Sequence, residues 1–205
     1  MYLEAIKLKR KRVFEKLKRF SEFHLGGGTA LALQIGHRIS VDFDLFSKKD
    51  IPLNFLDKIK KVFKNSKMIV IISHPEQLSV KVDGVRIDFV KYNFPILFEP
   101  IKFQGINILQ IPEITAMKAY TIGRRATFKD YVDLYFILKE KYITIKEITK
   151  IANKKYRDEF DSRLFLEQLV FFEDIKKMKI EFLREKATRR EIQKFFENEV
   201  KKIRI

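Results

Sequence analysis

HLGGGTALALQIGHRISVDFDLFS, residues 24–47, contains the strongest indications of the fold. Three consecutive glycines open a run rich in alanine and leucine, which predicts a turn and then a helix over residues 29–34 that ends at Gly36. Such a helix presents free backbone N–H groups and the positive end of its dipole at the glycines. The turn is therefore a candidate phosphate site, although a glycine run can also be an ordinary loop.

Two aspartates, Asp42 and Asp44, follow the last glycine after thirteen intervening residues. Polar and apolar residues alternate from 40 to 46, which predicts a strand with both aspartates on one face. Two carboxylates on one face can bind a single divalent cation, although such a pair is often only a solvated strand face. A phosphate-binding turn followed by metal-binding carboxylates indicates phosphoryl or nucleotidyl transfer.

A third acid, Asp88, lies in VRIDFV with apolar neighbours like those of Asp42 and Asp44. If its strand pairs beside the first, three carboxylates come together, and their repulsion makes burial costly. Two Mg²⁺ ions would offset this cost and would hold the attacking and leaving oxygens of an in-line displacement. We expect Asp88 to be a metal ligand or the base for the incoming hydroxyl.

Four polar residues further along the chain are candidates for the same site. Lys118 lies among apolar residues of a predicted helix, so it is either a surface lysine with a buried stem or a phosphate ligand. Asp130 and Asp133 are three residues apart and share one face of the next predicted helix. Asp130 either belongs to the site or forms a helix cap or an ion pair with Arg125.

The histidines do not indicate a metal site of their own. His24 and His74 are expected to be structural or exposed, because no second histidine and no cysteine gives a metal-binding spacing. His37 and its neighbour Arg38 have two interpretations, which are contact with phosphate and bridging to Asp42.

The composition excludes several classes of protein. Hydrophobic residues make up 46% of the 205 residues, and twenty phenylalanines exclude general disorder. The absence of cysteine excludes disulfides, zinc–thiolate sites and cysteine nucleophiles. The first twenty residues are too charged for a signal peptide, and no apolar run approaches a membrane span. We therefore expect a soluble, cytoplasmic protein with no membrane partner.

The charge balance indicates a polyanionic partner. The chain has 43 basic and 27 acidic residues, a net charge of +16, and residues 1–20 and 139–205 each contribute +6. Such an excess favours RNA as a partner. The alternative is a compositional bias of a hot habitat or of a lysine-rich genome.

The remaining pattern predicts an α+β fold in which a small mixed sheet bearing the acids is flanked by helices. A core over residues 1–140 and a helical C-terminal subdomain over 141–205 are expected, with a hairpin turn at Asp83 and Gly84. The other predicted helices cover 3–20, 53–64, 112–122, 130–139, 144–155, 161–170 and 188–203; the predicted strands cover 40–46, 68–72 (short and buried), 78–82, 85–92 and 94–111.

Three segments carry a resemblance to a known family: GGGTALALQIGHRISVDFDLF, VRIDFV and MKAYTIGRRATFKDYVDLYFIL. Together, in this order over residues 23–140, they resemble the AbiEii-type nucleotidyltransferase toxins, which include the MenT toxins and belong to the DNA-polymerase-beta-like superfamily. The resemblance implies that the core is a nucleotidyltransferase and that the chain is the toxin of a two-gene AbiE-type toxin–antitoxin system with a cognate antitoxin.

The resemblance also implies roles for individual residues. Asp42 and Asp44 match the metal-binding pair, and Asp88 matches the third carboxylate of the superfamily, a position at which the family varies. Either pair of glycines before Thr29 fits the signature that holds the triphosphate. The implied nucleotide-binding residues are Gly27, Gly28, Thr29, Arg38, Ser40, Lys118 and Arg125, and the implied catalytic residues are Asp42, Asp44, Asp88, Lys118 and Asp130.

The expected reaction is the Mg²⁺-dependent transfer of a nucleoside monophosphate from a nucleoside triphosphate to a hydroxyl. The resemblance and the basic ends favour the 3′ end of tRNA as the acceptor. One alternative is a nucleotidyltransferase of the antibiotic-modifying kind, whose signature would be an acidic acceptor pocket. The other is a non-catalytic module that binds nucleic acid or an antitoxin.

Overall fold

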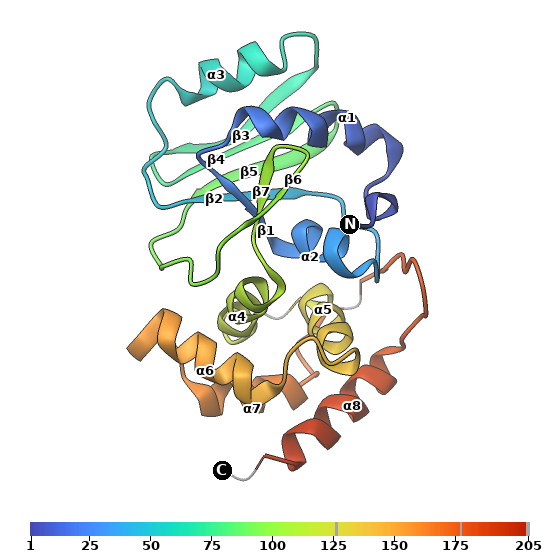
Figure 1. Cartoon of the computed structure of the whole chain (residues 1–205). Helices are drawn as coiled ribbons and strands as arrows, with labels where there is room; N and C mark the ends of the chain where they lie inside the picture. Colours follow the sequence, from blue (N-terminus) through green and yellow to red (C-terminus); the bar gives the residue numbers. More distant parts are fainter. Residues whose placement is uncertain (126, 177, 204–205) are drawn as a thin grey trace.

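A computed structural model describes residues 1–125, 127–176 and 178–203 of the chain. Seven strands form one mixed sheet: β1 (His24–Gly26), β2 (Phe43–Ser47), β3 (Met68–His74), β4 (Gln77–Val82), β5 (Val85–Lys91), β6 (Ile101–Phe103) and β7 (Ile106–Ile108). Their order across the sheet is β3-β4-β5-β2-β1-β7-β6 (Figure 1). In the centre, β2 runs parallel to β5 and antiparallel to β1.

Helices cover both faces of this sheet, which confirms the predicted α+β class (Figure 1). One face carries α1 (Leu8–Lys16) and α3 (Phe55–Val62), and the other carries α2 (Gly27–Ile35), α4 (Ile111–Ile122) and α5 (Phe128–Lys139). Packed against α4 and α5 are α6 (Ile145–Tyr156), α7 (Ser162–Val170) and α8 (Arg189–Lys201). Three short 3-10 helices complete the described elements: η1 (Leu3–Ala5), η2 (Leu17–Arg19) and η3 (Arg157–Glu159).

The central segment follows the prediction with shifted boundaries. α2 begins at Gly27, two residues before the predicted start, so two of the glycines lie in its first turn. It ends at Gly36, which has a φ of +62° and confirms the predicted stop. The following strand begins at Phe43 and not at residue 40, so Asp42 lies in the connection before the strand.

Two other predictions require correction. The helix predicted over residues 3–20 is divided into η1, α1 and η2. The predicted short buried strand is the exposed edge strand β3, in which Ile69, Val70 and Ile71 are 52%, 42% and 46% exposed. The apolar composition predicted the strand correctly, but the position of a strand at the edge of a sheet depends on long-range pairing that local sequence does not predict. The hairpin turn at Asp83 and Gly84 is confirmed between β4 and β5.

Alternation along β2 and β5 separates the apolar core from the acids. Phe43 and Phe89 are buried against the side of the sheet covered by α1 and α3, where their rings lie 6.0 Å from Phe14 and 5.0 Å from Phe20 respectively. Because successive side chains of a strand point to opposite faces, the intervening aspartates face α2, α4 and α5. The core thus fixes the side of the sheet on which the acids meet.

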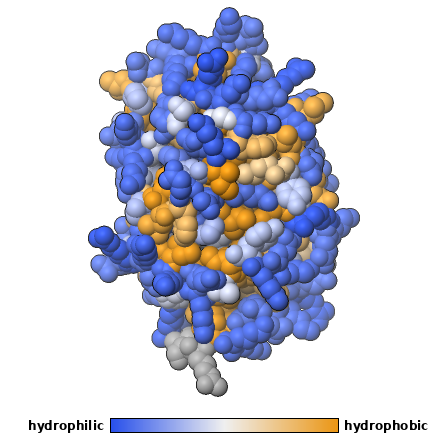
Figure 2. Space-filling view, in the orientation of Figure 1, coloured by the Kyte–Doolittle hydropathy of each residue, from blue (hydrophilic) through white to orange (hydrophobic). Residues whose placement is uncertain are grey.

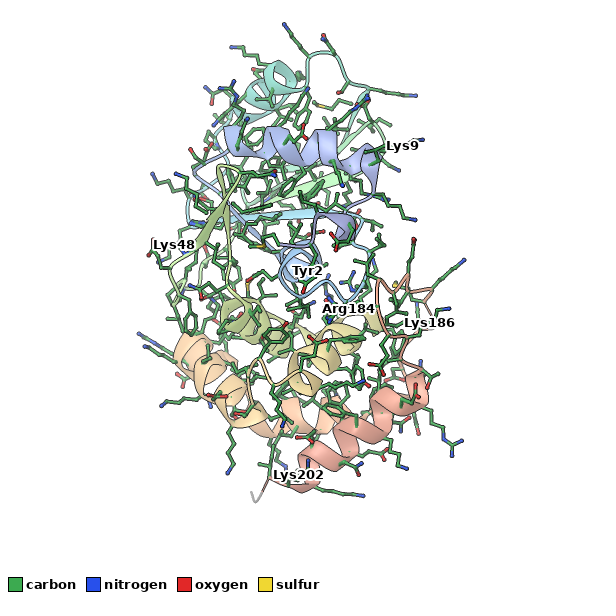
Figure 3. The ribbon with its side chains drawn as sticks, turned by 45° about the vertical axis from the view of Figure 1, so that its right-hand side comes forward. Tyr2, Lys9, Lys48, Arg184, Lys186 and Lys202 are labelled. Carbon is green, nitrogen blue, oxygen red and sulfur yellow. The ribbon has the colours of Figure 1, made fainter. Side chains whose placement is uncertain are left out.

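The C-terminal helices share one continuous apolar core with the sheet. A non-helical segment after α7 runs back to the end of α2, where Leu183 N–H donates to the carbonyl of His37. Arg184 there donates to the main-chain carbonyls of Ile35 and Gly36 (Figure 3). These carbonyls are the unpaired groups at the end of α2, so the segment caps that helix. The proposed boundary at residues 140 and 141 stays a prediction.

No helix within the described ranges combines the length and the apolar character that crossing a bilayer requires.

A buried ion pair joins α6 to α4 and gives a test of the fold. The ammonium of Lys155 contacts the carboxylate of Glu113 and the carbonyl of Pro95, and Glu113 also accepts from the N–H of Leu97. Lys155→Met leaves Glu113 buried and unpaired, so we expect urea unfolding to show a loss of about 3–5 kcal/mol. The exposed neighbour provides the control, since Lys154→Met is expected to change stability by less than about 0.5 kcal/mol. Equal effects of both variants would contradict this role.

Candidate active site

The glycine turn brings the N-terminus of α2 against one of the predicted carboxylates. A Cβ at Gly27, which has a φ of +62°, would lie 2.2 Å from Oδ2 of Asp44. A Cβ at Gly28 would lie 2.4 Å from Nη2 of Arg38. Glycine is required at Gly27 by conformation, and at both positions the missing side chain lets a charged group approach the helix backbone. Asp44 therefore lies at the positive end of the helix dipole.

Parallel pairing of β2 with β5 sets Asp44 directly beside Asp88. Asp42, just before β2, lines the same cavity of about 270 Å³. This is the juxtaposition of three carboxylates that the sequence predicts. Arg38, Ser40, Lys118, Arg125 and Asp130, all implied by the resemblance, line the cavity with them, as does Gly28.

Repulsion among these acids affects the protonation of Asp44. Burial, the charge of Asp88 and the charge of Asp42 raise the pKa of Asp44 to about 6, whereas Lys118 and Arg125 act in the opposite direction. Above this pH the carboxylate is charged at an energetic cost that a nearby cation would offset.

Asp88 is held by its neighbours in the sheet. Arg86, two residues earlier on β5, donates from Nε to Oδ2 at 2.8 Å and from Nη2 to Oδ1 at 3.1 Å. Ser79, opposite on β4, donates its hydroxyl proton to Oδ1. Arg86 was not among the residues predicted for the site, although its spacing from Asp88 in a strand places both side chains on one face.

The carboxylates are chemically suited to Mg²⁺, but their side chains are not arranged as a preformed metal site. Among the described residues, no three acidic or histidine side chains have the spacing of a metal site. Carboxylate oxygens are the ligands that Mg²⁺ prefers, and a cation would offset the burial and the charges of Asp88 and Asp42 that raise the pKa of Asp44. Asp42 and Asp44 are the residues that would hold the ion, because Asp88 is engaged by Arg86.

A buried cluster of charges supports the cavity from below, with Asp133 at its centre. Arg38 donates to both oxygens of Asp133, at 2.7 and 2.9 Å, and His37 Nε2 lies 2.6 Å from Oδ1. Asp133, and not Asp42, is thus the partner of both residues. Burial alone would raise the pKa of Asp133, but the charges of Arg38 and Lys118 hold it well below its ordinary value. Asp133 thus holds Arg38, His37 and Lys118 together, whereas its spacing in the sequence predicted only a shared helix face with Asp130.

Burial favours the neutral form of His37 in this cluster. Burial lowers its pKa more strongly than Asp133 raises it. A neutral ring that donates from Nε2 leaves Nδ1 as an acceptor, and this buried atom has no hydrogen-bond partner among the described residues.

Lys118 links this cluster to the cavity. Its ammonium lies 2.8 Å from Asp130 and 2.6 Å from Asp133, and it is only 6% exposed. Burial alone would lower the pKa of Lys118, but the two carboxylates raise it, so the lysine is charged. Asp130 also accepts a hydrogen bond from the hydroxyl of Thr127. Its partners are therefore Lys118 and Thr127, and not Arg125 as one interpretation of the sequence suggested. The surface-lysine interpretation of Lys118 is therefore wrong.

Thr29 and Ser40 fix the loop that precedes β2. The Thr29 hydroxyl is hydrogen-bonded to the Ser40 hydroxyl, 2.7 Å away, and to the carbonyl of Asp42. Thr29 is 1% exposed, so its side chain shapes the cavity from beneath. These bonds hold Asp42 next to the glycine turn.

The rim of the cavity carries further cations. Arg125 lies in the turn after α4 and lines the cavity, although the helix ends at Ile122 and does not continue through Gly123. Lys129, at the start of α5, lines it as well. Met178 reaches the cavity from the C-terminal segment, a contact that no local pattern could predict.

The fold is found in solved structures, one of which is a nucleotidyltransferase toxin. MenT4, a nucleotidyltransferase toxin from Mycobacterium tuberculosis, superposes with a TM-score of 0.59 at 16% identity, over 94% of this chain and 80% of that one. JHP933 from Helicobacter pylori gives a TM-score of 0.54 at 16% identity, over 97% of this chain and 94% of that one. These likenesses show the fold of the chain.

On this fold, a glycine turn beside paired acids is the arrangement expected for nucleotidyl transfer. Residues 11–204 match the family described as nucleotidyl transferase AbiEii toxin, type IV toxin–antitoxin system. The chain belongs to this family of toxin nucleotidyltransferases, which confirms the resemblance seen in the sequence. An uncharacterized protein of Aquifex aeolicus is 31% identical over 204 residues, or 97% of this chain and 98% of that protein.

The raised pKa of Asp44 predicts how stability depends on pH. Because the pKa is higher in the folded than in the unfolded chain, the contribution of Asp44 is favourable below pH 4 and is lost as the pH rises through about 6. Asp44→Asn is therefore expected to raise the free energy of unfolding at pH 8 by about 1–3 kcal/mol, with a smaller gain at pH 4. Asp57→Asn on the exposed face of α3 is the control. If Asp44→Asn is instead less stable than the unchanged chain at pH 8, the charged Asp44 is not repelled by Asp42 and Asp88 as proposed.

The buried cluster predicts the opposite effect at Asp133. Asp133→Asn removes the acid that balances Arg38 and Lys118, so two buried cations are left with only Asp130. We expect a loss of about 3–5 kcal/mol in urea unfolding at pH 7. A change as small as that of the exposed Asp57→Asn variant would show that the cluster is not a stabilising unit.

Proposed function

We propose that this toxin transfers a nucleoside monophosphate from a nucleoside triphosphate to the 3′ hydroxyl of tRNA and requires Mg²⁺. The observation that carries the proposal is the meeting of Asp42, Asp44 and Asp88 at the glycine N-terminus of α2, in a cavity also lined by cations. A triphosphate needs this combination, because helix N–H groups and cations hold its oxygens while carboxylates bind its metal.

The residues of the cavity have distinct tasks in this reaction. The N–H groups of Gly27 and Gly28 bind the terminal phosphates, and Arg125 and Lys129 at the rim neutralise them. Mg²⁺ held by Asp42 and Asp44 would stabilise the charge that develops on the transferred phosphate. Alignment of the acceptor with the α-phosphate supplies much of the remaining rate enhancement.

Lys118 has a donor available for the nucleotide. An ammonium group has three donors, and Asp130 and Asp133 use two of them. The third can reach a phosphate in the cavity that Lys118 lines. Asp130 and Asp133 keep the lysine charged and oriented, which is why a buried lysine is suited to this task.

The surroundings of the cavity favour a nucleic acid as acceptor. A second cavity of about 400 Å³ shares Asp44 and Asp88 and is lined by Phe46, Tyr92 and Tyr120, which suits a nucleoside. On the face shown in Figure 2, hydrophilic residues surround a hydrophobic band across the middle. Lys9, Lys48, Lys186 and Lys202 project outward from well-separated parts of the chain (Figure 3). The net charge of +16, together with these outward lysines, favours a polyanion over a cationic antibiotic as acceptor.

The remaining features of the proposal follow from the family. A tRNA extended at its 3′ end cannot accept an amino acid, which accounts for toxicity. A cognate antitoxin and action in the cytoplasm, where tRNA is available, belong to the same proposal.

Labelling tests the proposal. The protein is incubated with Mg²⁺, each α-³²P nucleoside triphosphate in turn and total RNA, beside the double variant Asp42→Ala/Asp44→Ala. We expect label in tRNA, no label in tRNA whose 3′ diol has been oxidised with periodate, and at least about a hundredfold loss in the variant. Label in oxidised tRNA, or equal labelling by the variant, would remove the 3′ end or the two acids from the mechanism.

The alternatives are separated in the same assay. Label transferred to an aminoglycoside and not to RNA would indicate the antibiotic-modifying class. Calorimetry with nucleotide and Mg²⁺ identifies a non-catalytic module, because a degenerate site would bind neither.

A further inference from the structure

Arg86 is a charged residue of the cavity that has no role in the nucleotidyl transfer proposed for this protein. It lines both cavities, as Asp44 and Asp88 do, and its side chain is 42% exposed whereas that of Asp88 is 10% exposed. Its position on β5 is fixed by backbone pairing with Lys81 on β4, and only its side chain is free to move. This partly exposed guanidinium therefore lies beside the carboxylates of the cavity.

The contacts of Asp88 show what Arg86 does to it. Arg86 donates to both oxygens of Asp88, and Ser79 donates to one of them. Three of the roughly four acceptor positions of the carboxylate are therefore filled. A divalent cation that binds Asp88 needs one of these oxygens and repels a guanidinium at the same oxygen. Arg86 and the cation thus compete for Asp88.

Arg86 has a second acceptor within the same cavity. The planar guanidinium binds two oxygens of a phosphate as well as two oxygens of a carboxylate. Arg86 shares the lining of both cavities with Gly28, whose N–H is proposed above to bind a terminal phosphate. Because the pair with Asp88 is partly exposed, breaking it has only a small energetic cost.

We propose that Arg86 is a positioning residue that exchanges partners, holding Asp88 until a divalent cation takes this carboxylate and then binding a substrate phosphate. The inference rests on the proposed function, because it takes a metal-bound triphosphate as the ligand of the cavity. Arg86 thereby makes the third carboxylate available only when metal and triphosphate are both present.

Two substitutions of Arg86 and one matched control test the exchange. Arg86→Gln removes the charge, and Arg86→Lys keeps the charge but loses the two-point contact. Lys81→Gln is the control, because Lys81 is exposed and pairs in register with Arg86. The control removes one positive charge from the same place on the sheet and leaves the contact with Asp88 intact. Thermal unfolding checks that each variant is folded.

The expected signature is a pair of opposite effects. In titrations of the protein with Mn²⁺ alone, Arg86→Gln is expected to bind the ion about fivefold more tightly than the unchanged chain, and Arg86→Lys is expected to lie between them. In titrations with the Mn²⁺ complex of inorganic tripolyphosphate at saturating Mn²⁺, Arg86→Gln is expected to bind about fivefold more weakly. Lys81→Gln is expected to change both affinities by less than twofold.

Other outcomes overturn the proposal in distinguishable ways. If Arg86→Gln matches Lys81→Gln in both titrations, or weakens both ligands, Arg86 has no exchange role. If Mn²⁺ binding is lost in Asp42→Ala/Asp44→Ala but unaffected by Arg86→Gln, the exchange is wrong and the metal site stands. If the unchanged chain binds no Mn²⁺ with or without tripolyphosphate, the exchange and the metal dependence of the proposed function both fail.

Discussion

The close approach of Asp44 to the backbone of Gly27 is the constraint on which the site depends. No side chain larger than hydrogen fits between them, since a Cβ would lie 2.2 Å from the carboxylate. The parallel pairing of β2 and β5 then places Asp88 beside Asp44, and the Thr29 hydroxyl holds the carbonyl of Asp42. Negative charge is thereby concentrated where helix N–H groups are exposed, and the acids and a phosphate can share a cation between them.

This concentration of charge has a cost, which is offset fully below the cavity and only in part within it. Below the cavity, Asp133 binds Arg38 and Lys118 so closely that the pKa of the acid stays well below its ordinary value. Within the cavity, Lys118 and Arg125 only partly offset the burial and the other acids that raise the pKa of Asp44 to about 6. The buried charges below the cavity are thus well paired, whereas the acids that line the cavity are less so, and perturbed pKa values of this kind are common at functional sites.

Local sequence patterns predicted the strands and the turn that carry the acids, but not the long-range contacts around them. Alternation and turn signals gave the strand of Asp44 and the hairpin that carries Asp88, because both follow from a period of two and a two-residue turn. The exposed edge position of β3, the return of the chain to His37 and the arrival of Met178 depend on long-range packing. The spacing of two residues between Arg86 and Asp88 could have predicted their contact, but only the apolar residues and the acid of that strand were used in its prediction.

The cations of the site therefore form two groups with different tasks. Arg38 and Lys118 are buried, and carboxylates of α5 bind both of them. Arg86, Arg125 and Lys129 line the cavity nearer to solvent, where an anion could reach them without entering the core. Desolvating the outer group is inexpensive and its contacts can change during binding, whereas the inner group stays fixed because separating its charges in the interior costs several kcal/mol. A site of this kind can admit a highly charged substrate without disturbing the core that positions its acids.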